Sequence, residues 1–439
     1  MFWGSAGQRG SVGLLRCWSL TVSPKTLTPT RCPLHTPRSL SFSAPLKSPA
    51  HEEVKQPLRR WDLAVSPFTT VRAQIGCNIS IHPLDPHTYP EADRAFITVH
   101  GPDKGQEVSL DRLKVHYDDR GKELLISAET VDSDVSIEMS APIKSNLFIT
   151  TQGKGSVQVK NMECDICKVR TEKGNCLLHS VKAHQVEVQS HEGHVTGVGT
   201  INGNVVISTG GDSAVDVKKL QGTKMNVSTE HGPLKVKAIY AESTCILSRS
   251  GRVNLGHVHG ETTVKNMCGD TVIDGSNSFL KVSSDSGGID VYVGDGGTAE
   301  LHSQQGAVSV RVPSSLRAGV RLCGTSVDIS PEVVLHGVEN SMSEGHTTVT
   351  GKLLTFFITL PCGTVNVPYP KTSNYINNVL SIICLCFFFP SYFYVPCSVF
   401  LSGYMNVEPP ANQWVKAQAD RGSIRLTLQS WFESRRLVS

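Results

Sequence analysis

The stretch 280-LKVSSDSGGIDVYVGDGGTAELHSQQGAVSVRV-312 decides the fold, because it contains one pattern twice. Gly287 and Gly306 lie 19 residues apart, and each stands in a polar turn. Apolar or small residues occur seven and five positions before each glycine and two and four positions after it. A separation of two predicts short strands with one buried face. The residues in these positions are Leu280, Val282, Ile289 and Val291 in the first unit, and Ala299, Leu301, Val308 and Val310 in the second.

The pattern recurs over residues 151–350, with spacings of 18 to 21 residues between turn glycines. Two strands of about five residues cannot bury a core alone, but stacked coils can. We therefore predict an all-β fold, a single-stranded, parallel β-helix-like β-solenoid with coils of about 19 residues and two short strands per coil. The turn glycines are Gly155, Gly174, Gly193, Gly211, Gly232, Gly251, Gly269, Gly287, Gly306 and Gly324.

Two units depart from the pattern. Around Gly211, Val206 and Val215 are out of step, which predicts a bulge or a corner insertion. After Gly193, Gly197 stands where an apolar residue is expected.

A metal site is suggested by 171-TEKGNCLLHSV-181, because Cys176 and His179 follow the pair Cys164-x-x-Cys167. However, Cys167 and Cys176 occupy the apolar positions around Gly174, where cysteine serves as a small buried hydrophobe. A zinc site needs its thiolates to converge on one point. We predict core residues here, and no metal or cofactor.

The regions beside the repeat differ from it. Residues 60–150 alternate apolar and polar positions without the 19-residue period, which predicts irregular β structure or a cap over the open end of the ladder. Residues 352–403 contain no acidic residue and four cysteines. Residues 376–403 are long and apolar enough for a membrane segment, although Pro390 and Pro396 interrupt them.

A retained intron is the second interpretation of residues 352–403, since Gly351-Lys352 can be encoded with an intron donor and pyrimidine-rich codons precede Ser402-Gly403. Removing the insert joins Gly351 to Tyr404. The repeat then resumes around Gly422, which predicts a final coil and C-terminal cap in residues 404–439, with Trp431 and Phe432 in the cap. The coil residues that match the pattern are Val415, Ala417, Ile424 and Leu426.

The N-terminal 51 residues carry six basic side chains and no acid. This composition, with many Ser, Thr and Pro, predicts a mitochondrial presequence over residues 1–50; a disordered cytoplasmic tail is the alternative. Of the 42 basic residues, 36 then remain against 39 acids, a balance that disfavours nucleic acid as a partner. The thirteen cysteines show no disulfide framework, which favours a thiol-tolerant compartment.

The elements 141-APIKSNLFITTQGKGSVQV-159 and 312-VPSSLRAGVRLCGTSVDIS-330, beside repeated G-x-V-x-V coils, resemble the "putative adhesin" family of β-solenoid domains of unknown function. The resemblance covers about residues 65–350 and rests on pattern rather than on a diagnostic motif. With the N-terminal composition and the tail 413-QWVKAQADRGSIRL-426, it extends to a vertebrate member of that family. It implies no catalytic residues.

Our leading hypothesis is a non-enzymatic binding or scaffold protein for an unknown protein or extended polymer, with no catalytic, cofactor-binding or metal-binding residues. One alternative is a parallel β-helix carbohydrate-active enzyme, for which the dense carboxylates are candidates. The other is a membrane-anchored interaction protein, if residues 352–403 are not an intron. The candidate carboxylates are Asp212, Asp216, Asp285, Asp290 and Asp295; His179, His184, His191 and His194 fit neither repeat period and are expected at the surface.

Overall fold

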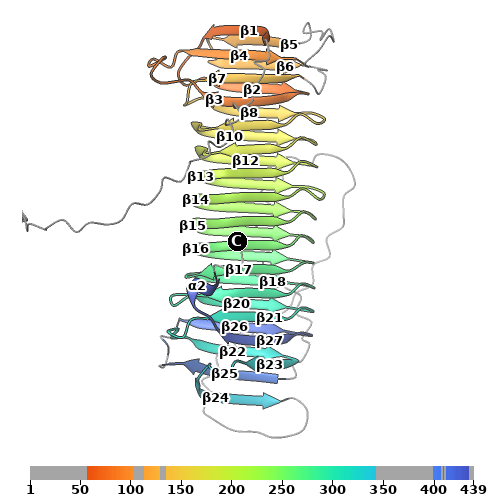
Figure 1. Cartoon of the computed structure of the whole chain (residues 1–439), viewed down its shortest axis with the longest axis vertical. Coiled ribbons are helices and arrows are strands. Elements are labelled where there is room, and N and C mark those ends of the chain that lie inside the picture. The colour runs from red at the N-terminus through yellow and green to blue at the C-terminus, as the bar shows by residue number, and fades with distance from the viewer. Residues whose placement is uncertain are drawn as a thin grey trace, which may run out of the picture. The chain divides into compact units, whose positions relative to one another are not determined.

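The computed structural model describes residues 57–101, 113–128, 135–342, 399–406, 409 and 412–434. These residues belong to one compact unit, Lys55–Ser439, and their strands form a single 27-stranded sheet (Figure 1). The all-β prediction is confirmed. The predicted presequence and most of the predicted insert, residues 352–398, lie outside the described residues.

Parallel pairing between successive coils builds the centre of the ladder. Val215 lies beside Leu234, and Leu234 beside Val253, so each step advances the chain by 19 residues. The two strands predicted for each coil merge into one bent strand in β13 to β16 and are separate elsewhere. The central strands are β8 (Asn146–Thr151), β9 (Val157–Lys160), β10 (Glu163–Thr171), β11 (Cys176–His179), β12 (Lys182–Ser190), β13 (Val195–Thr209), β14 (Val215–Thr229), β15 (Leu234–Ser248), β16 (Val253–Asn266), β17 (Thr271–Ser276), β18 (Phe279–Ser284), β19 (Ile289–Val293), β20 (Thr298–Ser303) and β21 (Val308–Val312).

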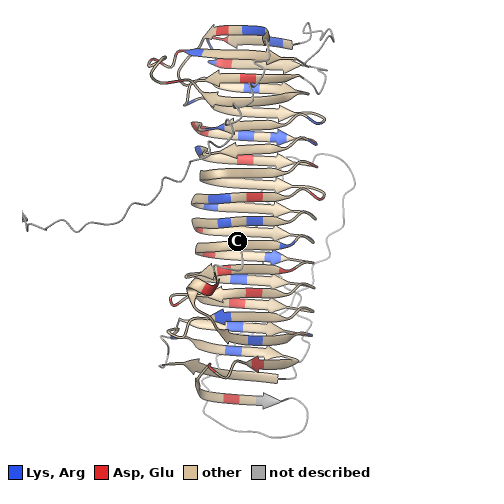
Figure 2. Ribbon diagram, in the orientation of Figure 1, with Lys and Arg blue, Asp and Glu red and all other residues tan. Residues whose placement is uncertain are grey.

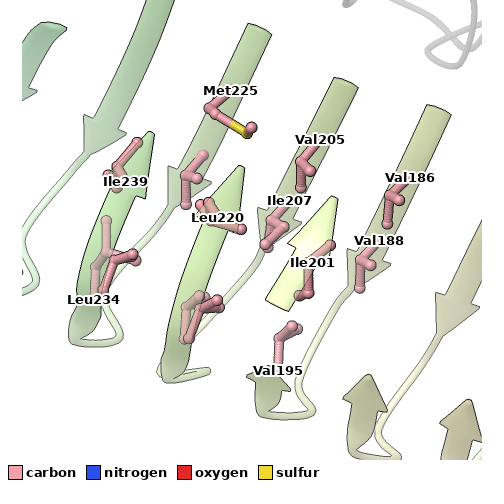
Figure 3. Packing of buried hydrophobic residues seen from close by; sticks show 14 of the residues in the cluster. Val186, Val188, Val195, Ile201, Val205, Ile207, Leu220, Met225, Leu234 and Ile239 are labelled. Carbon is pink, nitrogen blue, oxygen red and sulfur yellow. The ribbon is translucent and has the colours of Figure 1, made fainter. Parts of the chain in front are cut away.

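The core lies inside the coils, where inward side chains of successive strands stack in columns (Figure 3). Val205 of β13 is aligned with Met225 of β14, and both are fully buried. Ile201 and Leu220 fill the bend in the same two strands. Because strand side chains alternate, the neighbouring positions face outward and form rows along the ladder. We call the outward surface after each turn glycine face A, and the outward surface before it face B.

The turn glycines are needed because successive turns lie in backbone contact. A Cβ atom on Gly287 would overlap the carbonyl oxygen of Gly269, and one on Gly306 would overlap the carbonyl oxygen of Gly287. Neither glycine has a positive φ, so close approach, rather than backbone conformation, excludes a side chain.

A buried polar column supports these turns. Ser303 and Ser284 stand three residues before their turn glycines and are buried. The Oγ atom of each accepts a hydrogen bond of 2.8 Å from the turn glycine N–H. The resulting Ser-x-x-Gly motif is visible in the sequence, but the apolar pattern alone does not reveal it. It satisfies turn backbone groups inside the ladder.

The predicted corner insertion near Gly211 is confirmed. Ser190 is aligned with Thr209, an offset of 19, whereas Val195 is aligned with Val215, an offset of 20, so the turn between them holds one extra residue. Ser213 therefore takes the place that glycine has in other turns.

The space of the missing apolar side chain at Gly197 is filled from its own strand, β13, and from the next strand, β14. A Cβ atom on Gly197 would meet the side chains of Ile201 and Val217, at 2.9 and 2.8 Å. Both are fully buried, and they fill the space above the glycine.

Coils are not stacked in chain order at the N-terminal end. Strands β2 and β3 form a coil between that of β6 and β7 and that of β8 and β9. Antiparallel pairs β1–β4, β4–β7 and β5–β6 continue the sheet there. The strands of this end are β1 (Pro57–Ala64), β2 (Thr70–Ile75), β3 (Asn78–Pro83), β4 (Arg94–His100), β5 (Leu113–Asp118), β6 (Glu123–Ala128) and β7 (Ser136–Ala141).

The C-terminal end is interleaved in the same way. The coil around Gly422 is present as predicted, and Val415, Ala417, Ile424 and Leu426 are buried. It lies between the coils of Gly306 and Gly324, rather than after both. The sequence could not show this order because every coil offers the same parallel edges. The elements are β22 (Gly319–Gly324), β23 (Ser326–Ile329), β24 (Leu335–Met342), β25 (Val399–Met405), β26 (Trp414–Ala419), β27 (Ser423–Leu428) and α2 (Trp431–Ser434).

Strand β25 pairs antiparallel with β22 and β24, and it contains Val399–Gly403, the described part of the predicted insert. Trp431 and Phe432 were predicted to cap the last coil. They lie instead in helix α2, which runs along the side of the ladder (Figure 1). Its Trp431 ring is 5.7 Å from the His257 ring, and Phe432 is 75% exposed. No helix in the described ranges is long and apolar enough to cross a membrane.

A substitution of Gly287 by alanine should lower the free energy of unfolding by about 1–3 kcal/mol, because the new methyl group overlaps backbone that cannot rotate away. The neighbouring Gly288→Ala variant is the control, since its Cβ would come no closer than 3.3 Å to another atom. Urea titration followed by circular dichroism measures both. Equal effects at the two positions would contradict the backbone-contact explanation.

Candidate functional site

The three cysteines near Gly174 lie in the core. Cys167 and Cys176 are fully buried and Cys164 is 8% exposed, so the predicted core positions of Cys167 and Cys176 are confirmed. Burial raises the pKa of Cys164 and of Cys176 to about 12, and that of Cys167 well above its usual value. Because the thiolate is the metal ligand, this environment disfavours metal binding. In the described part of the chain, no group of three or more His, Cys, Asp or Glu side chains is placed to hold a metal ion.

The four histidines take separate places. His179 Nδ1 lies 3.1 Å from Asn161 Oδ1, and His184 Nδ1 lies 3.0 Å from Asp165 Oδ1 on an exposed corner. His194 Nδ1 accepts a hydrogen bond of 2.9 Å from the Ala214 N–H, and His191 is exposed in a turn. The contacts of His179, His184 and His194 run to the neighbouring coil rather than to another of these histidines.

The candidate carboxylates do not form one cluster either. Asp212 and Asp216 are exposed, and Asp285 and Asp295 lie in the turns on either side of β19. Ser315 donates a hydrogen bond of 2.6 Å to Asp295. Asp290 differs from these, because it projects from β19 toward a buried arginine.

That arginine, Arg311 of β21, is the centre of a polar cluster on face A. It is 6% exposed, and its Nε donates a hydrogen bond of 2.7 Å to Asp290 Oδ1. Its Nη1 donates to Gln429 Oε1 at 3.2 Å, and its Nη2 donates to the Ile273 carbonyl at 3.3 Å. Asp274 Oδ1 lies 3.8 Å from Nη2. We call Asp274, Asp290, Tyr292, Arg311 and Gln429 the Arg311 cluster.

The cluster combines neighbouring coils with the end of the chain. Tyr292 is aligned with Arg311, and Arg311 with Thr427, so these positions form one outward row. Tyr292 and Arg311 are buried although they face outward, because the segment after β27 turns over them. The Gln429 N–H donates to the Val312 carbonyl at 2.9 Å, and α2 follows at Trp431.

Burial dominates the electrostatics of Asp274. It raises the pKa of this carboxyl to about 6; the Arg311 charge opposes the rise, and the Asp290 charge adds to it. Burial also raises the pKa of Tyr292. The Arg311 guanidinium occupies the position facing both carboxylates. A glycosidase instead aims its two carboxylates at the bond it cleaves, so this arrangement favours a structural ion pair.

An open groove on face A adjoins the cluster, with a volume of about 580 Å³. Its wall includes Asp290, Arg425 and Asp328, and the Arg425 Nε lies 3.0 Å from Asp328 Oδ2. Neither Asp274 nor Arg311 was among the residues predicted from the sequence. The sequence nevertheless contained a signal for these two residues. Both stand five positions after a turn glycine, in the same outward row, and a charge that becomes buried in such a row needs a partner.

The Asp274→Asn variant should alter the pH dependence of stability. An unfolded aspartate titrates near 3.9, whereas native Asp274 titrates at about 6. The native protein therefore binds more protons between these values, and the stabilising contribution of the protonated form is lost as pH rises from about 4 to about 6. The free energy of unfolding of the variant should rise relative to wild type over this interval and stay level above about pH 7.

Urea unfolding from pH 4 to pH 8 measures this difference, with Asp285→Asn in a turn as the control. A difference between Asp274→Asn and wild type that does not change with pH would contradict the assignment.

The sequence matches the Toastrack DUF4097 family over residues 114–210 and 186–352, which together span 239 of the 439 residues. A solved structure of a "putative adhesin" from Parabacteroides merdae ATCC 43184 is similar at 10% identity and a TM-score of 0.30, covering 56% of this chain and 95% of that one. A "putative cell adhesion protein" from Clostridium sporogenes ATCC 15579 is similar at 9% identity and a TM-score of 0.14, covering 85% and 100%. At these scores the two structures carry no argument about function.

Proposed function

Because the chain belongs to the Toastrack DUF4097 family, we propose that it is a non-enzymatic β-solenoid binding protein that holds an extended partner along a lateral face of its ladder. The observation that carries this proposal is the register of outward side chains. On face B, Val206 is aligned with Asn226, Asn226 with Cys245, and Cys245 with Thr263. Adjacent strands lie about 4.8 Å apart, so such a row offers evenly spaced contacts.

The neighbouring row on face B is polar and uncharged over β13 and β14. The Ser228 hydroxyl donates a hydrogen bond of 3.0 Å to the Ser208 hydroxyl. Hydroxyl and amide groups in fixed register suit an extended chain better than a compact small molecule, because each repeat of the chain can meet an equivalent group.

Photo-crosslinking tests the proposal. A benzoyl-phenylalanine crosslinker in place of Asn226 on face B, or of Asn254 on face A, should capture a partner in extracts of cells that express the protein. Glu192, which is exposed in a turn, is the control position. We expect capture from a lateral face and little from the turn. Turnover of a carbohydrate by the purified protein, or capture only at Glu192, would overturn the proposal.

We further propose that the protein is mitochondrial and that residues 352–403 are a retained intron. The acid-free N-terminal segment supports the first idea, and the buried coil that follows the insert supports the second. A fluorescent fusion should lose its mitochondrial signal when residues 1–50 are deleted. Deleting residues 352–403 should leave the signal and the extraction by alkaline carbonate unchanged. Membrane retention that depends on residues 352–403 would instead support an anchor.

A further inference from the structure

Four lysines gather on face A and the adjoining bend of β14 and β15; we call Lys218, Lys219, Lys235 and Lys237 the lysine patch (Figure 2). Val217 is aligned with Val236 and Leu220 with Ile239, which places Lys218 beside Lys237. Lys218 and Lys237 are exposed, and Lys219 and Lys235 are half-buried. Two adjacent strands therefore bring four positive charges together.

This patch departs from the charge pairing seen elsewhere in the ladder. Opposite charges face each other on successive coils at Lys168–Glu187, Lys416–Glu300 and Arg425–Asp328, with distances of 3.0, 3.1 and 3.0 Å. Within the described ranges, no ion pair involves any of the four lysines of the patch. Like charges directly opposite on adjacent strands are destabilising. An external anion would remove this repulsion.

An aromatic stack adjoins the patch. The Lys219 Nζ lies 4.9 Å from the Tyr240 ring centroid, and the Tyr240 and His259 rings are stacked at 4.5 Å. Lys219 reaches the Tyr240 ring from β14 and His259 reaches it from β16, the strands on either side of β15. Binding of single-stranded nucleic acid uses free aromatic faces for base stacking, so this arrangement favours a partner recognised by its charge alone.

We propose that the lysine patch binds an acidic segment of a partner protein in an extended conformation, with its carboxylates at alternate positions. This inference rests on the proposed function and names the chemistry of the partner. Lys235 and Lys237 are two residues apart on one strand, so their Cα atoms are separated by about 6.6 Å. Alternate carboxylates of an extended peptide have the same spacing, which lets the peptide follow the strand.

The acidic neighbour of the patch limits where the peptide lies. Asp216 is aligned with Lys235 and repels an approaching carboxylate. One carboxylate of the partner therefore lies between Lys218 and Lys237, on the side of the patch away from Asp216, and the next one along the peptide reaches Lys235. Lys219 extends the positive charge around the bend toward Tyr240.

Fluorescence anisotropy with two labelled peptides tests the inference on the full chain. In one peptide glutamate and serine alternate, and in the other the same residues form one block of each. We expect the alternating peptide to bind the more tightly, with a Kd that rises with salt because exposed charges are screened. The double variant Lys218→Ser with Lys237→Ser should weaken binding by about fivefold or more, as expected for the loss of two exposed ion pairs.

The matched control is Lys265→Ser with Lys281→Ser, which removes the same charge from exposed positions on face B and should change the Kd by less than about twofold. Equal loss in both double variants, or equal binding of the two peptides, would overturn the inference. So would binding of a single-stranded oligonucleotide or of phosphatidylserine vesicles to the patch in preference to the alternating peptide.

The outcome separates this inference from the proposed function. If no peptide binds while the crosslinker at Asn226 still captures a partner, the acidic segment is wrong and the lateral-face binding protein stands. If neither lateral position captures a partner, the proposed function fails as well.

Discussion

The stacked turns at the glycine column are the constraint on which the rest of the structure depends. In most turns the glycine lies so close to the adjacent turn that a Cβ atom would overlap its carbonyl oxygen, at 1.9 Å for Gly174, 1.8 Å for Gly287 and 2.1 Å for Gly306; Gly211, beside the extra residue, is an exception. This contact keeps successive coils in parallel register, and a buried serine three positions earlier accepts a hydrogen bond from the turn glycine in the coils of Gly193, Gly287 and Gly306. The 19-residue repeat follows, because a coil with one more residue must place it in a corner, as near Ser213.

Register in the core also sets the chemistry of the surface. Inward positions pack as apolar columns, so the outward positions between them become rows whose members come from successive coils. Where the charges in a row alternate, they pair, as in Lys168 with Glu187. Where lysine meets lysine, as in Lys218 and Lys237, the row is left with a charge that a partner can satisfy. A repetitive core can therefore support a surface that differs from coil to coil.

Both ends of the ladder use the same solution. A coil from one part of the chain enters between two coils from another, β2–β3 at one end and β26–β27 at the other, and antiparallel strands follow outside it. The C-terminal case has a second consequence. The chain that leaves β27 covers Arg311, so an outward row becomes a buried ion pair, and the raised pKa of Asp274 follows from this burial.

The sequence by itself determined the solenoid, the strand faces and the core positions of Cys167 and Cys176, because these depend on local periodicity and on glycine at the turns. It also predicted the coil of Val415 and Leu426. Tertiary structure alone decided the order of the coils and the burial of Asp274 and Arg311. All coils offer the same parallel strand edges to their neighbours. The local sequence therefore does not show that the Gly422 coil lies before the Gly324 coil in the ladder. The environment of Arg311 likewise depends on Gln429, which is 118 residues away in the chain and becomes its neighbour only when the last coil enters the ladder.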